Sequence, residues 1–115
     1  MVLLLATLNS GTQAQLGHPL GHRFDESLQR SDMDILRPGV RALLEEGADH
    51  SQWTWENDQT GNGGIVLLKN SFNHDGMHCR RIEQQLKFRG QSDVRRFHLS
   101  YCRVGEQEWK ILAEN

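Results

Sequence analysis

The fold of this chain is decided by the stretch CRRIEQQLKFRGQSDVRRFHLSYCR, residues 79–103. Apolar residues alternate with polar ones along both halves of it, at Ile82, Leu86 and Phe88 and then at Phe97, Leu99 and Tyr101. This period of two is typical of strands that bury one face. Between the halves, the pair Gly90-Gln91 places glycine first, which suits the positive φ of a two-residue type II′ loop. The stretch therefore predicts an antiparallel hairpin that turns at Gly90-Gln91.

The position of this turn also predicts how the two strands are paired. If the hairpin is centred between Gly90 and Gln91, Leu99 lies opposite Ile82 and Cys102 lies opposite Cys79. Directly opposed Cβ atoms are roughly 4.5–5.5 Å apart, somewhat wide of the disulfide optimum but within reach of a small adjustment. Because the turn and the apolar pattern pair the cysteines without having been chosen to do so, we expect a disulfide between Cys79 and Cys102.

Residues 32–46 have the pattern of one amphipathic helix. Ser31 supplies a hydroxyl cap with acidic residues in the first turn, and Gly47 supplies a stop. The apolar residues at helical spacing are Leu36, Val40, Leu43 and Leu44. Pro38 either kinks this helix or is the first residue of a shorter one. We favour a single helical unit across residues 32–46 that lies on the apolar face of the sheet.

The remaining strand signals lie on both sides of the hairpin. Trp53 and Trp55 share one face of a short strand, and residues 57–64 are rich in turn-forming Gly and Asn. Residues 65–72 form the most apolar strand, which we expect to be central, and residues 108–113 form the last strand. The chain is therefore predicted to be an α+β domain, with one principal helix packed on an antiparallel meander of about five strands.

The first 30 residues do not share this pattern. Residues 1–14 contain a short apolar core followed by Thr12-Gln13-Ala14, which is similar to a small-x-small cleavage site. We interpret them as a signal-peptide remnant, too short to span a bilayer; the alternative is a strand or helix that packs on the core. Residues 15–30 are interpreted as a flexible linker, in which Pro19 disfavours the helix that would bring His18 and His22 together on a metal. The domain proper covers residues 31–115.

Charge is unevenly distributed along the chain. Residues 1–60 carry four Lys and Arg against nine Asp and Glu, whereas residues 61–115 carry nine against six. The basic residues of the hairpin region are Arg80, Arg81, Lys87, Arg89, Arg95, Arg96 and Arg103. They divide between the two faces of the predicted sheet, as a solvated strand surface would, and the rival interpretation is a patch for an anionic envelope polymer or an acidic partner. The candidate partner-binding residues are Arg80, Arg81, Arg96 and Arg103.

Residues with catalytic or metal-binding potential are few. The sequence has no nucleophile elbow, zinc-protease helix, P-loop or dinucleotide fingerprint. His74, Asp75, His78 and Cys79 form one cluster of ligand-type side chains, but a disulfide would remove Cys79 from it. Glu83 opposite His98 resembles an acid–base pair, but on an exposed sheet face such a pair is more often a cross-strand charge pair. We therefore predict no catalytic residue, no metal site and no cofactor, and the chain is not expected to be an enzyme.

Several short motifs resemble the C-terminal domain of the rickettsial-type surface antigens of proteobacteria. These motifs are Trp55-Glu56-Asn57, Thr60-Gly61-Asn62-Gly63-Gly64, Cys79-Arg80, Cys102-Arg103 and Trp109-Lys110-Ile111. The resemblance covers residues 31–112. It departs from the family pattern in lacking a glycine-zipper segment and a lipid-attachment cysteine, and in carrying Phe88-Arg89-Gly90 where Gly-Gly is common. The resemblance implies a location in the cell envelope and supplies no reaction.

Two hypotheses of function follow. The first is a non-catalytic domain of the bacterial envelope, periplasmic or associated with the outer membrane, that binds an envelope protein or an anionic polymer and no nucleic acid. Export to an oxidising compartment would agree with the expected disulfide. The alternative is a small periplasmic metal-binding protein or enzyme that uses His74, His78 and His98.

The export interpretation predicts the mature N-terminus. If residues 1–14 are a signal remnant, protein recovered from its native host should begin near Gln15. N-terminal sequencing measures this directly, and cytoplasmic protein that retains Met1 would contradict export.

Overall fold

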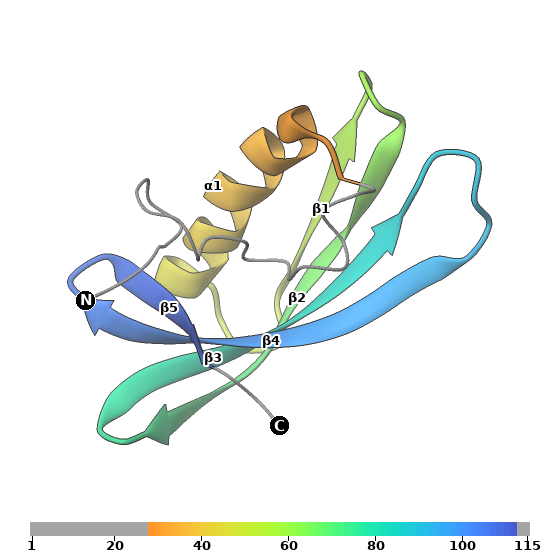
Figure 1. The fold of residues 1–115 in the computed structure, drawn as a ribbon. Coiled ribbons are helices and arrows are strands. Elements are labelled where there is room, and N and C mark those ends of the chain that lie inside the picture. The colour runs from red at the N-terminus through yellow and green to blue at the C-terminus, as the bar shows by residue number, and fades with distance from the viewer. Residues whose placement is uncertain (1–27, 113–115) are drawn as a thin grey trace.

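The computed structural model describes residues 28–112 as a helix followed by five strands. The elements are α1 (Arg30–Glu46), β1 (Gln52–Asn57), β2 (Asn62–His74), β3 (Met77–Lys87), β4 (Val94–Gly105) and β5 (Glu108–Leu112). Every strand is antiparallel to its sequence neighbour, and the sheet order is β1-β2-β3-β4-β5 (Figure 1). The α+β meander is thereby confirmed. The expected signal remnant, residues 1–14, lies outside the described residues, as do His18, His22 and nearly all of the linker.

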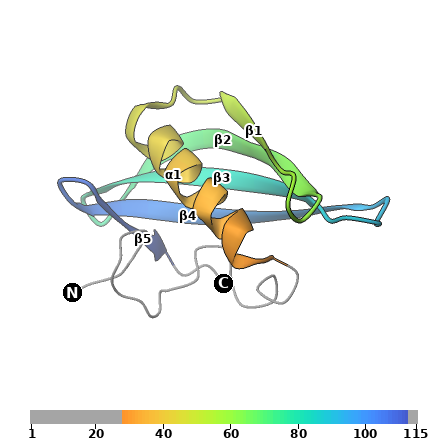
Figure 2. The same ribbon diagram turned by 90° about the horizontal axis from the view of Figure 1, so that it is seen from above.

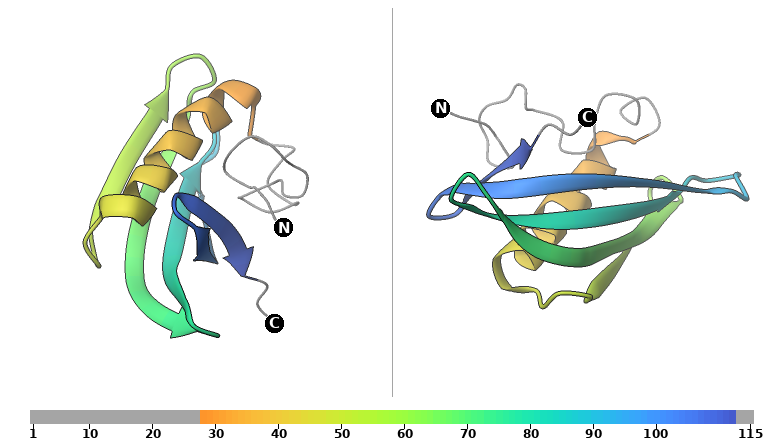
Figure 3. Two further views of the ribbon diagram at one scale, coloured as in Figure 1. Left: turned by 90° about the vertical axis from the view of Figure 1, so that its left-hand side faces the viewer. Right: turned by 90° about the horizontal axis from the view of Figure 1, so that it is seen from below.

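The helix and the sheet form two layers. Helix α1 packs against β1 and β2 on one face of the sheet, which we call the core face. Within the described residues no helix packs on the opposite face of β2, β3 and β4, which we call the outer face (Figures 2 and 3). Short strand β5 folds back beside β4 at the end of the sheet where α1 finishes (Figure 1). The two faces of the sheet therefore differ, because α1 covers only the core face.

The register of the central hairpin is confirmed, whereas its predicted turn is wrong. Cys79 pairs with Cys102, and Ile82 pairs with Leu99. The strands stop at Lys87 and Val94, however, and the N–H of Gln91 donates to the carbonyl of Phe88 at 3.0 Å. Gly90 has a φ of 79° at the third position of this turn, where a type II turn requires a positive value. The loop is longer than two residues but symmetric about the same point, so the pairing is unchanged.

Helix α1 is a single unit that contains Pro38, as favoured from the sequence. Its start differs from the expectation, because the residue before the helix is Gln29, whose N–H donates to the carboxylate of Asp32 at 2.9 Å. Ser31 lies inside the helix and accepts a hydrogen bond from Asn57 at 2.9 Å. The hydroxyl cap predicted at Ser31 is therefore wrong, and the first-turn acidic residue satisfies the free N–H instead.

Two glycines allow close approaches around the helix. The N–H of Gly47 donates to the carbonyl of Leu43 at 2.8 Å and ends α1 with a φ of −71°, so no left-handed residue is used. A Cβ at Gly47 would lie 2.7 Å from that same carbonyl oxygen. Within the helix, a Cβ at Gly39 would fall 2.1 Å from the Trp53 ring. Glycine at position 39 therefore lets the indole lie directly against α1.

The core lies between α1 and the sheet. Its buried apolar side chains include Leu36, Val40, Leu43 and Leu44 from the helix and Trp55, Val66, Leu68, Ile82, Leu86, Tyr101 and Trp109 from the strands. Trp55 and Trp109 thus fill the core, and Trp53 packs against it. Burial raises the pKa of the Tyr101 hydroxyl, because the charged phenolate is disfavoured away from water.

The amide of Gln84 and the Nε1–H of Trp55 lie in this core without a hydrogen-bond partner among the described residues. Gln84 is fully buried on the core face of β3, and neither its amide nitrogen nor its amide oxygen is paired. Its neighbours in register are Val66 on β2 and Phe97 on β4. An unpaired buried amide loses its hydration without compensation. Gln84 is therefore a destabilising residue in an otherwise apolar layer.

Replacing this amide should stabilise the domain. Gln84→Leu retains the approximate volume and removes two unpaired polar atoms, so the free energy of unfolding should rise by about 1–2 kcal/mol. Chemical denaturation of both proteins measures the change. The control Gln85→Leu should give no gain, because that amide donates to Glu83 at 2.8 Å. A loss of stability in Gln84→Leu would show that the buried amide has a partner.

Candidate functional site

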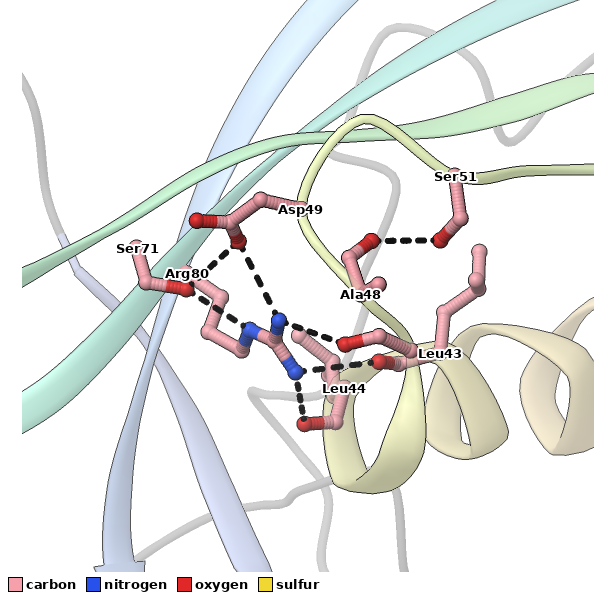
Figure 4. A network of polar contacts seen from close by, with 8 residues as sticks. Leu43, Leu44, Ala48, Asp49, Ser51, Ser71 and Arg80 are labelled. Atoms are coloured by element: carbon pink, nitrogen blue, oxygen red, sulfur yellow. Dashed lines mark hydrogen bonds and ion pairs between the residues drawn. The ribbon is translucent and has the colours of Figure 1, made fainter.

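Arg80, one of the four candidate partner-binding arginines, points into the domain. Its Nη1 donates to the carbonyls of Leu43 and Leu44 at 3.3 and 3.0 Å, and its Nη2 donates to the carbonyl of Gly47 at 2.6 Å (Figure 4). These carbonyls lie at the end of α1, where backbone oxygens lack the full set of helical partners, and the helix dipole makes this end negative. Arg80 is 8% exposed. Its guanidinium therefore caps the helix from the sheet.

The same guanidinium is held by two polar side chains. Its Nε donates to the hydroxyl of Ser71 at 3.0 Å, and its Nη2 lies 3.2 Å from the carboxylate of Asp49. Hydrogen bonds from Ser71 and then Arg80 hold the pKa of Asp49 below its usual value. Arg80 has no donor left to offer a partner molecule. The structure therefore places the Arg80 guanidinium between the sheet and α1, away from the outer face.

Arg103 makes a second attachment between sheet and helix. Its Nη2 donates to Oε1 of Glu45 at 2.8 Å, and Trp109 Nε1 donates to Oε2 of the same carboxylate at 2.7 Å. The guanidinium also lies 4.7 Å from the centre of the Trp109 ring. Burial would raise the pKa of Glu45, but the hydrogen bonds from Trp109 and Arg103 outweigh it and lower that pKa. Arg103 is about one-third exposed and is committed to these contacts.

A buried carboxylate makes the third attachment, and the sequence interpretation missed it. Asp32 is fully buried in the first turn of α1. Its Oδ1 accepts from Asn57 and Thr60, both at 2.7 Å, and its Oδ2 accepts from Asn62 and the Gln29 N–H, both at 2.9 Å. Burial would raise the pKa of Asp32, but these hydrogen bonds hold it below its usual value. The polar residues interpreted as ordinary turn formers are ligands of this carboxylate.

The glycines of the same motif serve close contacts between the two hairpin ends. Gly61 has a φ of 78°, and a Cβ there would meet the side chain of Arg89 at 2.9 Å. The N–H of Arg89 donates to the side-chain oxygen of Asn62 at 2.9 Å. A Cβ at Gly64 would lie 3.1 Å from Trp55 Nε1. This motif therefore builds structure and offers no free chemical group.

Cys79 and Cys102 form the expected disulfide. Their Cα atoms are 4.0 Å apart, and both residues are buried on the outer face of the sheet. Directly opposed strand residues must come together in this way to allow the bond. The described residues contain no free cysteine.

The outer face carries a cluster of charges around Glu83. Its carboxylate lies 3.2 Å from His98 Nε2, 3.6 Å from Lys69 Nζ and 3.9 Å from Arg96 Nε, and it accepts from Gln85 at 2.8 Å. The hydrogen bond from Gln85 is the main reason that the pKa of Glu83 is lowered; burial opposes it, and Lys69 and His98 assist. One carboxylate thus holds side chains from β2, β3 and β4. The pairing of Glu83 with His98 agrees with the predicted register.

Several further basic residues share this face. The strand pairing places Arg81, Lys87 and Lys110 on the same side of the sheet as Glu83. Arg81 is half-buried and engaged in a contact, whereas the Arg96 side chain is 62% exposed and that of Lys69 is 45% exposed. We call the set Lys69, Arg81, Lys87, Arg96, His98 and Lys110 the basic face. Of the four candidate arginines, Arg81 and Arg96 belong to it.

An open trough continues the outer face towards the hairpin ends. Its volume is about 870 Å³, and its lining includes Glu56, Gly63, Ile65, Gln85 and Lys87. Gly63 contributes no side chain to this lining, so backbone is uncovered there. The trough extends the outer face beyond the Glu83 cluster.

The three histidines of the alternative hypothesis are not brought together. His74 pairs with Asp75 at 3.3 Å in the β2–β3 turn, and His78 lies with its ring 6.2 Å from that of Trp109. His98 is on the outer face beside Glu83. No three His, Cys, Asp or Glu side chains among residues 28–112 gather as metal ligands would. Within the same residues, no helix has the length and apolar character needed to cross a membrane.

A family model described as the 17 kDa outer membrane surface antigen matches residues 42–110, well over half of the 115-residue chain. The match contains the motif residues from Trp55 to Trp109 whose contacts are given above. No curated protein and no solved structure matches the chain significantly.

The buried carboxylate predicts how stability responds to acid. Because the pKa of Asp32 is lowered in the folded state, its contribution is present above the unfolded value near 3.9 and is lost as pH falls through the folded value. Asp32→Asn should lower the free energy of unfolding by about 2–4 kcal/mol at neutral pH, since an amide cannot accept all four donors. The variant should also lose less stability than the native protein between about pH 4 and pH 2.

Denaturant titrations across this pH range test both statements. The matched control is Asp34→Asn, on an exposed position of the same helix, which should change stability by no more than about 0.5 kcal/mol. Equal effects of the two substitutions would contradict the role assigned to Asp32.

Proposed function

The chain belongs to the family of the 17 kDa outer membrane surface antigen, and from this premise we propose that it is a non-catalytic domain of the bacterial envelope. In this proposal the domain binds an anionic envelope polymer through its basic face. It resides in the periplasm or at the outer membrane. The basic face is the observation that carries the proposal.

Three features of the basic face support binding of a polyanion. The face lies opposite α1, so no helix among residues 28–112 covers it (Figure 3). Lys69 on β2 and Arg96 and His98 on β4 lie on either side of β3 and are gathered by its carboxylate Glu83. Cations held at fixed positions on a flat surface concentrate a polymer of repeating negative charge. The adjoining trough gives such a polymer a continuous path along the sheet.

The internal residues support a binding domain over an enzyme. Arg80, Arg103 and Asp32 have their polar atoms engaged in attaching α1 to the sheet. The outer-face carboxylate, Glu83, holds basic side chains in place and has a lowered pKa, so it is charged and not poised to give up a proton at neutral pH. These residues hold the domain together, and the surface that we propose for binding is the basic face.

The disulfide supports the proposed location in an oxidising compartment. Cysteine pairs persist in oxidising environments such as the periplasm and are rare in the cytosol. The Cys79–Cys102 bond joins the two strands that present most of the basic face. An oxidising compartment would therefore keep this surface in one arrangement.

The proposal is tested with a polyanion of known composition. Binding of the full chain to dextran sulfate, with neutral dextran as reference, should be measured by titration calorimetry at low and physiological salt. We expect binding to the sulfated polymer alone, weakening as salt screens the charges over about 8 Å. The double variant Lys69→Gln/Arg96→Gln should weaken binding by about tenfold or more.

The matched control removes the same charge from the other layer. Arg30→Gln/Arg37→Gln changes two exposed arginines of α1 and should alter the affinity by less than about twofold. Equal losses in the two double variants would show that binding reflects net charge alone. Binding that is absent in low salt would overturn the proposal.

A further inference from the structure

Strand β4 is paired with β3 along almost its whole length but with β5 over only part of it. The β4–β5 ladder runs from Gly105 paired with Glu108 to Ser100 paired with Leu112. Among residues 28–112, no strand pairs with residues 94–99 on the side away from β3 (Figure 1). We call residues 94–99 the β4 edge. At the rise of an extended strand it is about 20 Å long, which is enough for a peptide strand to pair with it.

The backbone N–H and C=O groups of this edge alternate in direction from one residue to the next. The Cα atoms of Cys79 and Cys102 are 4.0 Å apart, and opposed residues come this close at non-hydrogen-bonded positions of an antiparallel ladder. Hydrogen-bonded and non-hydrogen-bonded positions alternate along the strand. Val94, Arg96 and His98, like Cys102, are therefore at positions that are not hydrogen-bonded to β3. Their N–H and C=O groups therefore point away from β3. These groups are the donors and acceptors that a further strand would use.

The core side of the β4 edge carries apolar side chains that are only partly buried. Phe97 and Leu99 are partly buried and pack against the core. Helix α1 makes most of its sheet contacts with β1 and β2 and not with β4. Apolar side chains on an added strand would therefore extend the core over Phe97 and Leu99.

The outer side of the β4 edge is basic. Arg96 and His98 project there, and residues 94–105 include three arginines and no acidic residue. Opposite charges on adjacent strands attract, and like charges repel. Pairing with the same edge of a second copy would bring Arg96 of both copies together, which is how charged edges resist self-association. The charge therefore selects an acidic partner.

The other edge of the sheet, strand β1, is not basic on its outer side. The outer-face residues of β1 are Gln52, Thr54 and Glu56, with no basic side chain among them. An acidic strand would thus be attracted to β4 and not to β1. Strand β1 serves as an internal comparison for any experiment on the β4 edge.

We propose that the β4 edge binds an extended peptide segment of a partner protein in which acidic and apolar residues alternate. The peptide pairs its backbone with Val94, Arg96 and His98. Its acidic side chains face Arg96 and His98, and its apolar side chains cover Phe97 and Leu99. This binding mode is independent of polymer binding, because it requires the backbone of one edge and not the whole basic face.

Hydrogen exchange of individual backbone amides in the full chain tests the proposal. The probe is a short peptide of repeated Glu-Val, and the reference is the same peptide with Lys in place of Glu. With the Glu-Val peptide, exchange at Val94, Arg96 and His98 should slow by about tenfold or more. Exchange in β1 should not change, and the Lys-Val peptide should protect neither edge.

Two charge reversals on the same face separate this site from polymer binding. Arg96→Glu should weaken Glu-Val binding by about tenfold or more. Lys110→Glu makes the same charge change on β5, opposite Cys102, and should leave it within about twofold. Dextran sulfate binding should fall in both variants, so the two proposals fail separately.

Three results would overturn the proposal. Amides of Val94, Arg96 and His98 that already exchange slowly in the free chain would mean that the chain itself covers the edge. Protection that rises with protein concentration would assign the edge to a second copy. Equal protection by the two peptides would show that charge does not select the partner.

Discussion

The hydrogen bonds from the Arg80 guanidinium to the last carbonyls of α1 hold the two layers of this domain together. Arg80 acts from the sheet on one end of the helix, and Asp32 acts from the helix on the polar turn between β1 and β2 at the other end. Both charges are buried, and each would be left without partners if the layers moved apart. Losing the partners of a buried charge is costly. The helix is therefore fixed at both ends, and its position does not depend on apolar packing alone.

These attachments give the motif residues of this chain a structural role. Asn57, Thr60 and Asn62 bind the Asp32 carboxylate, Arg80 and Arg103 bind the helix, and the two cysteines bind each other. Such residues specify a fold. Function in this chain is accordingly sought in the basic face and the β4 edge, where the side chains are exposed and the backbone is open.

The sequence was sufficient for the features that depend on local periodicity. Alternation in residues 79–103 gave the hairpin register and, through it, the cysteine pairing and the Glu83–His98 contact. That register already placed Arg80 beside Ile82 on the apolar face, but nothing local indicates that a helix ends above it. Asp32 was missed for the same reason, because its side-chain ligands Asn57, Thr60 and Asn62 lie 25 to 30 positions away along the chain. The predicted helix start and turn type were wrong. Polar residues near the helix start, such as Ser31, and the loop glycine Gly90 each allow more than one local geometry.

The disulfide has a topological consequence for the hairpin that it closes. Cys79 and Cys102 lie near the end of the β3–β4 ladder that is farthest from the loop of residues 88–93. A protease that cut this exposed loop would produce two chain segments, each carrying one cysteine. They would remain covalently joined and paired in register along both strands. Cleavage there would open the loop without releasing either strand, so the domain can survive a broken backbone as a two-chain molecule in a compartment that contains proteases.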